Sequence, residues 1–196
     1  MIDIVELVID EESVKDGVDA ISLVEHPAIE ENFVALSKHE VEFKAIDNEK
    51  RIVVGLALIP EKLIYRRNKE SEYYITFSKE TVRKASELYL KRLKNNNATL
   101  EHEIKTDGVS VIESWIVEDL EKDKSALYGL NASIGSWCVT MKIDNDKVWQ
   151  DVKDGTYLGL SIEGIFSNRE SQEDLKANKQ LDAIRNIIRE NESKVL

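Results

Sequence analysis

Runs of apolar residues, most of them alternating with polar residues, recur along the chain and predict strands. In 109–119 and 156–166 the apolar side chains occupy every second position, which is the period of a strand with one buried face. The stretch 50–60 is almost continuously apolar and predicts a buried strand that ends at Pro60. Further strands are predicted at 2–9, 72–78, 98–104 and 135–143.

Three segments follow the helical period instead. Ser78 is a suitable N-cap for a helix over 79–97, in which apolar residues recur on one face. A second helix is predicted within 146–155, with Gly155 as its C-cap candidate. The segment 171–196 is highly charged and has apolar residues at helical spacing, which predicts an amphipathic helix.

These elements divide the chain into three parts. Residues 1–43 are expected to form an N-terminal arm, in which one strand is followed by irregular or short helical pieces. Residues 44–168 form the predicted core domain, and 169–196 form a charged amphipathic helix or tail. The predicted fold class is α+β with a mostly antiparallel sheet.

Composition and charge exclude several classes of protein. The chain has 38 acidic and 27 basic residues and a formal net charge of −11, so a nucleic-acid partner is not expected, because phosphate binding needs a basic surface. No apolar run approaches the ~20 residues that span a bilayer, and the acidic N-terminus does not resemble a signal peptide. A soluble, intracellular type of protein is therefore expected, without a membrane partner. Cys138 is the only cysteine, and no metal-ligand or phosphate-loop motif occurs, so no disulfide, metal or cofactor is expected.

Ser161 is a candidate nucleophile because it lies between two glycines in an apolar run. A Gly-x-Ser-x-Gly nucleophile elbow needs a glycine two residues before and two after the serine, whereas Gly164 comes three residues after Ser161. The alternation instead places Ser161 on a strand, on the same face as Gly159 and Glu163 and opposite the more apolar face. The pattern alone favours a structural serine on a polar strand face.

A serine hydroxyl needs a neighbouring base, and histidine, with an ordinary pKa of about 6.5, is the usual one. His26 precedes a proline in the N-terminal arm, and His39 lies in a charged stretch. Only His102 falls within a predicted strand of the core, where a rigid scaffold could hold it near a serine. On spacing alone, a half-buried structural histidine is the more frequent explanation.

A third group would orient the imidazole and stabilise its charged form. The alternation in 109–119 places Glu113 among apolar neighbours, where an unpaired carboxylate is costly to bury. Glu113 is therefore the first candidate for this role, and Asp119 at the end of the same strand is the second. An edge position open to water would explain Glu113 equally well. For the oxyanion, the small residues around Gly135 are a candidate source of backbone donors.

An ordered set of motifs carries a family resemblance. The stretches LEHE, VIESWIVED, GSWCVTMKI and VWQDVKDGTYLGLSIEG occur in this order, after VVGLALIPEKLIYRR and YYITFSKETV. Over about 44–167 the chain resembles the tailed-phage prohead (capsid maturation) proteases, specifically the XkdF-like phage serine proteases. The resemblance implies a fold related to herpesvirus assemblin, with a mostly antiparallel, β-barrel-like core surrounded by helices.

The resemblance also implies a function. His102 and Ser161 match the catalytic positions of such serine endopeptidases, with Glu113 as our choice for the third residue. Enzymes of this kind act in the host cytoplasm inside the assembling procapsid, where they cleave scaffold, the major capsid protein and themselves, and homo-oligomers are common. The alternative is a non-catalytic capsid-assembly protein that uses the same fold to bind scaffold. A small esterase is a further possibility.

Overall fold

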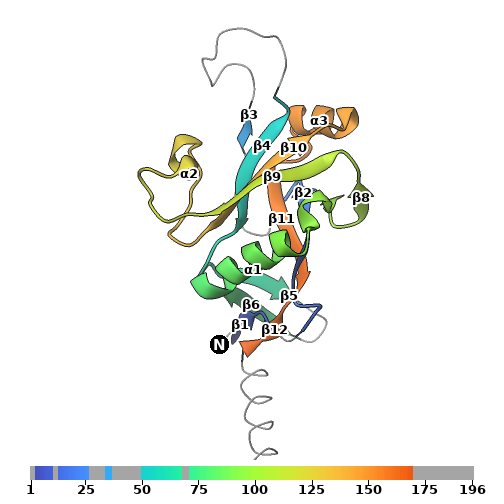
Figure 1. The fold of residues 1–196 in the computed structure, drawn as a ribbon. Coiled ribbons are helices and arrows are strands. Elements are labelled where there is room, and N and C mark those ends of the chain that lie inside the picture. Colours follow the sequence, from blue (N-terminus) through green and yellow to red (C-terminus); the bar gives the residue numbers. More distant parts are fainter. Residues whose placement is uncertain (1–2, 11–12, 27–33, 37–49, 68–70, 170–196) are drawn as a thin grey trace, which may run out of the picture.

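The computed structural model describes residues 3–10, 13–26, 34–36, 50–67 and 71–169 (Figure 1). The amphipathic helix predicted in 171–196 lies outside these residues. Most of the described elements are strands, which are arranged in three sheets of four strands each.

The first sheet has the strand order β12-β1-β6-β5. Its members are β1 (Asp3–Val8), β5 (Ile64–Arg67), β6 (Glu72–Phe77) and β12 (Ser167–Asn168). Strands β1 and β6 are parallel, whereas β12 and β5 are antiparallel to their neighbours. The N-terminal strand of the chain is thereby held between the strand before helix α1 and the strand that follows the Ser161 segment.

The second sheet is antiparallel throughout and has the order β3-β4-β10-β9. Its members are β3 (Val34–Leu36), β4 (Ile52–Leu58), β9 (Val109–Ile116) and β10 (Trp137–Ile143). All residues of β4 except the first, and all of β10 except Lys142, are buried. The apolar sequences of these two central strands are explained by this burial on both faces.

The third sheet has the order β11-β2-β7-β8. Ser161 lies on its strand β11, and His102 lies in the turn between its strands β7 and β8. Its members are β2 (Gly17–Val24), β7 (Ala98–Leu100), β8 (Ile104–Thr106) and β11 (Gly159–Ile165). Strand β2 pairs antiparallel with β11 and parallel with β7. Strand β2 belongs to the segment 1–43, which was expected as an N-terminal arm, and its residues were not predicted as a strand.

Helices cover the sheets at a few places (Figure 1). Helix α1 (Lys79–Lys91) begins after Ser78, whose side chain accepts a hydrogen bond from Thr81 N–H, as predicted. It is followed by a 3₁₀ turn, η1 (Lys94–Asn96), and the remaining helices are α2 (Lys124–Leu127) and α3 (Asp146–Lys153). Among the described helices, none combines the length and the apolar composition that crossing a membrane requires.

The core is formed where α1 packs on strands of the second and third sheets. Tyr89 of α1 and Trp137 of β10 are fully buried, and their rings meet edge to face with centroids 5.4 Å apart. Phe77 and Phe166 form a second such pair at 5.0 Å, between the first sheet and the end of β11. Full burial of each large apolar side chain contributes about 1.5–3 kcal/mol relative to its exposure.

The fold is therefore predominantly β, with three α-helices and mostly antiparallel pairing in the described residues. Two pairings, β1–β6 and β2–β7, are parallel. The strands described here form three separate sheets and do not close into a barrel. The barrel-like part of the predicted fold is therefore not seen.

Candidate active site

Ser161 lies in the middle of β11, at one end of a row of three hydroxyl-bearing residues. Ser161 is directly opposite Ser22 of β2, and Ser22 is opposite Thr99 of β7. Directly opposite residues place their side chains on the same face of a sheet, about 5 Å apart between Cβ atoms. The predicted strand position of Ser161 is confirmed.

The hydroxyl of Ser161 has no hydrogen-bond partner among the described residues, although only 8% of the residue is exposed. The neighbouring Ser22 differs, because its Oγ accepts from His102 N–H at 3.0 Å and donates to Thr99 O at 3.3 Å. Tyr89 Oη is the only described side-chain polar atom that is both fully buried and unpartnered. Ser161 Oγ therefore retains access to solvent and is available for a reaction, whereas Ser22 Oγ is engaged.

His102 lies at the tip of the tight turn between β7 and β8. Glu101 and His102 both have left-handed backbone conformations, with φ of 50° and 61°. The turn is anchored on β2, because Glu101 N–H donates to Leu23 O at 3.1 Å and His102 N–H donates to Ser22 Oγ. The expectation of a continuous strand over 98–104 was wrong. Two consecutive residues with positive φ reverse the chain there, which alternation alone does not reveal.

The imidazole of His102 faces a carboxylate that the sequence analysis did not single out. His102 Nδ1 lies 3.3 Å from Glu163 Oε1, and the two side chains are 42% and 29% exposed. Thr99 Oγ1 donates a hydrogen bond to the same carboxylate oxygen. The alternation already placed Glu163 on the face of Ser161, and this was the signal that could have identified it.

The three groups lie together on one face of the third sheet. Ser161 and Glu163 are two residues apart on β11, which is about 6.6–6.8 Å along a strand. His102 contacts Glu163 through its side chain and contacts Ser22, the cross-strand partner of Ser161, through its backbone. The described structure contains no hydrogen bond between Ser161 Oγ and the imidazole.

The structure does not bring Glu113 to His102. Glu113 lies on β9 of the second sheet, where it accepts hydrogen bonds from Lys124 Nζ at 2.6 Å and Thr140 Oγ1 at 2.7 Å. The hydrogen bond from Lys124, and then that from Thr140, holds the pKa of Glu113 below its ordinary value. The carboxylate is paired with a lysine, and its side chain is 43% exposed on the edge strand β9, which fits the alternative of an edge position open to water.

The other candidates also lie elsewhere. Asp119 Oδ1 accepts from the backbone N–H groups of Glu121 and Lys122 and so stabilises a turn. His26 is largely exposed beside Glu25, and His39 lies outside the described residues. The N–H of Gly135 donates to Val117 O at 2.8 Å, so it is not a free donor for an oxyanion.

The environment of Cys138 disfavours thiol chemistry. Cys138 is fully buried in β10, and burial raises the pKa of its thiol to about 12. A thiol in such an environment is a poor nucleophile, because the thiolate is the reactive form. Among the described residues, no group of three or more histidine, cysteine, aspartate or glutamate side chains could hold a metal ion.

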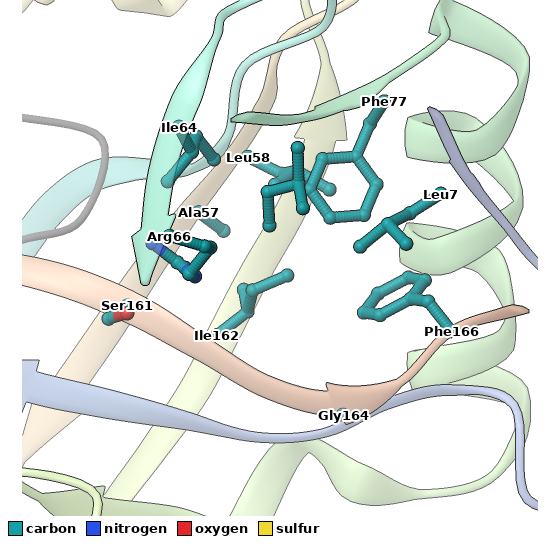
Figure 2. A pocket seen from close by; sticks show the side chains of 11 residues that line it. Leu7, Ala57, Leu58, Ile64, Arg66, Phe77, Ser161, Ile162, Gly164 and Phe166 are labelled. Atoms are coloured by element: carbon teal, nitrogen blue, oxygen red, sulfur yellow. The ribbon is translucent and has the colours of Figure 1, made fainter. Parts of the chain in front are cut away.

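A pocket of about 200 Å³ lies beside Ser161, between β11 and the strands β4, β5 and β6. Eight of its eleven lining residues are apolar. Arg66 is the charged residue among these eleven. Figure 2 shows Ser161 and Arg66 at the same end of this pocket, with Phe166 at the opposite end. The candidate nucleophile thus adjoins a space that could hold a substrate side chain.

Comparison with known families identifies the class of protein to which this site belongs. Residues 40–170 match the family described as "Putative phage serine protease XkdF". Because the match includes His102, Ser161 and Glu163 and extends over more than half of the chain, the protein belongs to this phage serine protease family. Comparisons with curated proteins and with solved structures gave no match.

Proposed function

We propose that the protein is a prohead maturation endopeptidase in which Ser161 is the nucleophile, His102 the general base and Glu163 the group that orients His102. The observation that carries the proposal is the contact of His102 Nδ1 with Glu163 Oε1, on the sheet face that also holds the unpartnered hydroxyl of Ser161. Membership of a phage serine protease family supports the same chemistry.

The assignment of Glu163 replaces Glu113 as the third residue. A carboxylate in contact with Nδ1 favours the tautomer that carries its proton on Nδ1, so Nε2 is free to accept a proton from a serine. Thr99 also holds this carboxylate, because its hydroxyl donates to the same oxygen. Glu113 cannot take this role from its present position, because it is bonded to Lys124 and Thr140 of a different region.

The reaction proceeds by acyl transfer. His102 Nε2 takes the proton of Ser161 as Oγ attacks the peptide carbonyl carbon, and Glu163 stabilises the imidazolium that forms. The tetrahedral intermediate collapses when His102 returns the proton to the leaving amine nitrogen. Water, deprotonated by His102, then attacks the acyl-enzyme and releases the new carboxyl terminus and Ser161. The proposal requires Ser161 Oγ and His102 Nε2 to come within hydrogen-bond distance when substrate binds, since catalytic hydrogen bonds often tighten only in the substrate complex.

The substrates proposed from the family resemblance are the phage scaffold and the major capsid protein, together with the enzyme's own chain. The site of action is the interior of the assembling procapsid in the host cytoplasm. A homo-oligomer is proposed on the same ground. The acidic net charge of −11 fits protein substrates better than nucleic acid, because it repels phosphate.

The experiment compares the wild-type protein with Ser161→Ala during co-expression with the scaffold and the major capsid protein. We expect Ser161→Ala to abolish both self-cleavage and capsid-protein processing, with a loss of ~10⁴-fold or more in rate. Ser110→Ala is the matched control, because it removes a strand hydroxyl from β9 of the second sheet, away from His102 and Glu163. Processing that continues undiminished in Ser161→Ala would contradict the proposal.

The non-catalytic alternative makes a different prediction for the same samples. A protein that only binds scaffold would assemble procapsids equally well in the wild-type and Ser161→Ala forms, without cleavage in either, and a fluorophosphonate probe would not label Ser161. Labelling of the wild-type protein that is lost in both Ser161→Ala and His102→Ala supports the protease. Labelling that is unchanged in His102→Ala would remove His102 from the mechanism.

A further inference from the structure

The pocket beside Ser161 is shaped for an apolar group. Residues from five strands line it, among them Leu58 of β4, Ile64 of β5 and Ile162 of β11. In Figure 2, the side chain of Ile162 lies between Ser161 and Phe166. The free energy falls when an apolar group displaces water from such a surface.

The size of the pocket limits what it can accept. Its volume of about 200 Å³ is somewhat larger than the roughly 150 Å³ apolar cavity that is known to bind benzene in an engineered protein. A side chain of the size of leucine, methionine or phenylalanine would fill it, whereas alanine would leave most of it empty. The pocket therefore discriminates by size as well as by polarity.

Arg66 adds a restriction by charge. Its Nη1 donates to Tyr65 O at 2.9 Å, which holds the guanidinium near the end of the pocket where Ser161 lies. Within the described residues, no carboxylate forms an ion pair with Arg66. A substrate lysine or arginine entering here would meet the like charge of the half-buried Arg66, and juxtaposed like charges disfavour binding.

The position of the pocket relates it to the bond that is cleaved. Strand β11 forms one edge of its sheet, and Ser161 and Ile162 are consecutive residues on opposite faces of this edge strand. A peptide that passes along the edge with its carbonyl carbon at Ser161 has a neighbouring side chain within reach of Ile162 and the pocket behind it.

We propose that this pocket is the specificity subsite for the substrate residue next to the cleaved bond, that it selects a large apolar side chain, and that Arg66 rejects basic ones. The inference rests on the proposed function, since it assumes that Ser161 attacks the peptide. It assigns the substrate class, namely peptide segments with a leucine-, methionine- or phenylalanine-sized residue beside the cut.

The test is a cleavage profile of the full chain on a synthetic peptide library in which every pair of neighbouring residues occurs, read by mass spectrometry. Cuts that disappear in Ser161→Ala are counted. We expect kcat/KM for leucine or phenylalanine next to the cut to exceed that for alanine and for lysine by at least about tenfold. A preference for small or basic residues would overturn the pocket assignment while leaving the protease proposal intact.

Arg66→Gln tests the charge separately. We expect this variant to raise the lysine-to-leucine ratio of kcat/KM about tenfold, because the like charge is removed, with the apolar preference retained. Arg67→Gln is the matched control, because Arg67 is 73% exposed beside Glu72 and does not line the pocket. An unchanged ratio in Arg66→Gln would overturn the role of Arg66. A library without any Ser161-dependent cut would contradict the proposed function and this inference together.

Discussion

Two glutamates in different sheets each have one threonine and one basic residue beside them, but the basic residue differs. Glu163 of the third sheet accepts a hydrogen bond from Thr99 and contacts His102, whereas Glu113 of the second sheet accepts from Thr140 and Lys124. Each therefore has one threonine and one basic residue beside it. The ladder also shifts register next to each carboxylate, between Glu163 and Gly164 in one sheet and opposite Glu113 in the other.

The difference between the two basic partners decides what each site can do. Lys124 is a permanent cation near neutral pH, and its hydrogen bond to Glu113 raises its pKa further. An ammonium group has donors only and cannot accept a proton from a nucleophile. An imidazole has one nitrogen that can face a carboxylate and another that can accept a proton. Glu163 therefore belongs to a site suited to proton transfer, and Glu113 to an ion pair that holds β9 to α2.

The largest expected effect separates the two carboxylates by activity. Glu163→Gln should lower kcat by roughly 10⁴-fold, because the amide no longer fixes the tautomer of His102 or stabilises its charged form. Glu113→Gln should stay within a few-fold of the wild type. Cleavage of the capsid protein under identical conditions measures both variants.

Folding has to be checked in the same samples, by circular dichroism and by the urea midpoint. A large loss of activity in Glu113→Gln with full activity in Glu163→Gln would reverse the assignment and return the orienting role to Glu113. Equal activity in both variants would leave Ser161 and His102 without a third member.

A smaller effect tests the register shift beside Glu163. A Cβ atom on Gly164 would lie 2.2 Å from Gly17 O of the neighbouring strand, so Gly164→Ala must push β11 and β2 apart. We expect this variant to lower the free energy of unfolding by about 3 kcal/mol, measured by urea denaturation. In Gly129→Ala, the control, nothing lies within 4 Å of the new Cβ and only the φ of 66° is unfavourable, so the loss should be about 1–2 kcal/mol. Equal losses in the two variants would show that the close approach of β2 to Gly164 adds nothing to the cost of the substitution.

The smallest effect concerns the ion pair of the second sheet. The pKa of Glu113 lies below the ordinary 4.5 because Lys124, and then Thr140, donate to the carboxylate. A lowered pKa in the folded state means that the stabilisation is present above the unfolded pKa and is lost as the pH falls through the folded value. Lys124→Met should therefore raise the pKa of Glu113, seen in an NMR titration of the side-chain carboxyl, and make stability less dependent on pH in the acid range.

The change in stability should be slight, because both side chains are about half exposed. An unchanged pKa of Glu113 in Lys124→Met would show that the hydrogen bond from Lys124 is not the main cause of its lowered value.

Local signals in the sequence predicted much of the fold. The N-cap at Ser78, the buried strand that ends near Pro60 and the helix before Gly155 all depend on residues close together in the chain, and the structure confirms each of them. Gly155 has a φ of 76°, as expected for a glycine that follows a helix. These features follow from periodicity and capping, which neighbouring residues determine.

The site depended on pairings that no local pattern encodes. His102 approaches Glu163 because β7 lies parallel to β2, and β2 lies antiparallel to β11, so segments far apart in the chain become neighbours. Alternation grouped Ser161 with Glu163 but could not show which histidine lay above them. It grouped Glu113 with apolar neighbours, whereas the register shift beside it leaves the side chain exposed at the sheet edge, where it meets Lys124 of α2.

In the proposed enzyme, strand β2 makes the active site depend on the N-terminal segment of the chain. It lies between β11, which carries Ser161, and β7, which leads to His102, so these two segments have no direct pairing with each other. A cut that releases residues 17–24 would remove the strand that joins the segment of the proposed nucleophile to that of its base, so the site depends on a part of the chain remote from it in sequence.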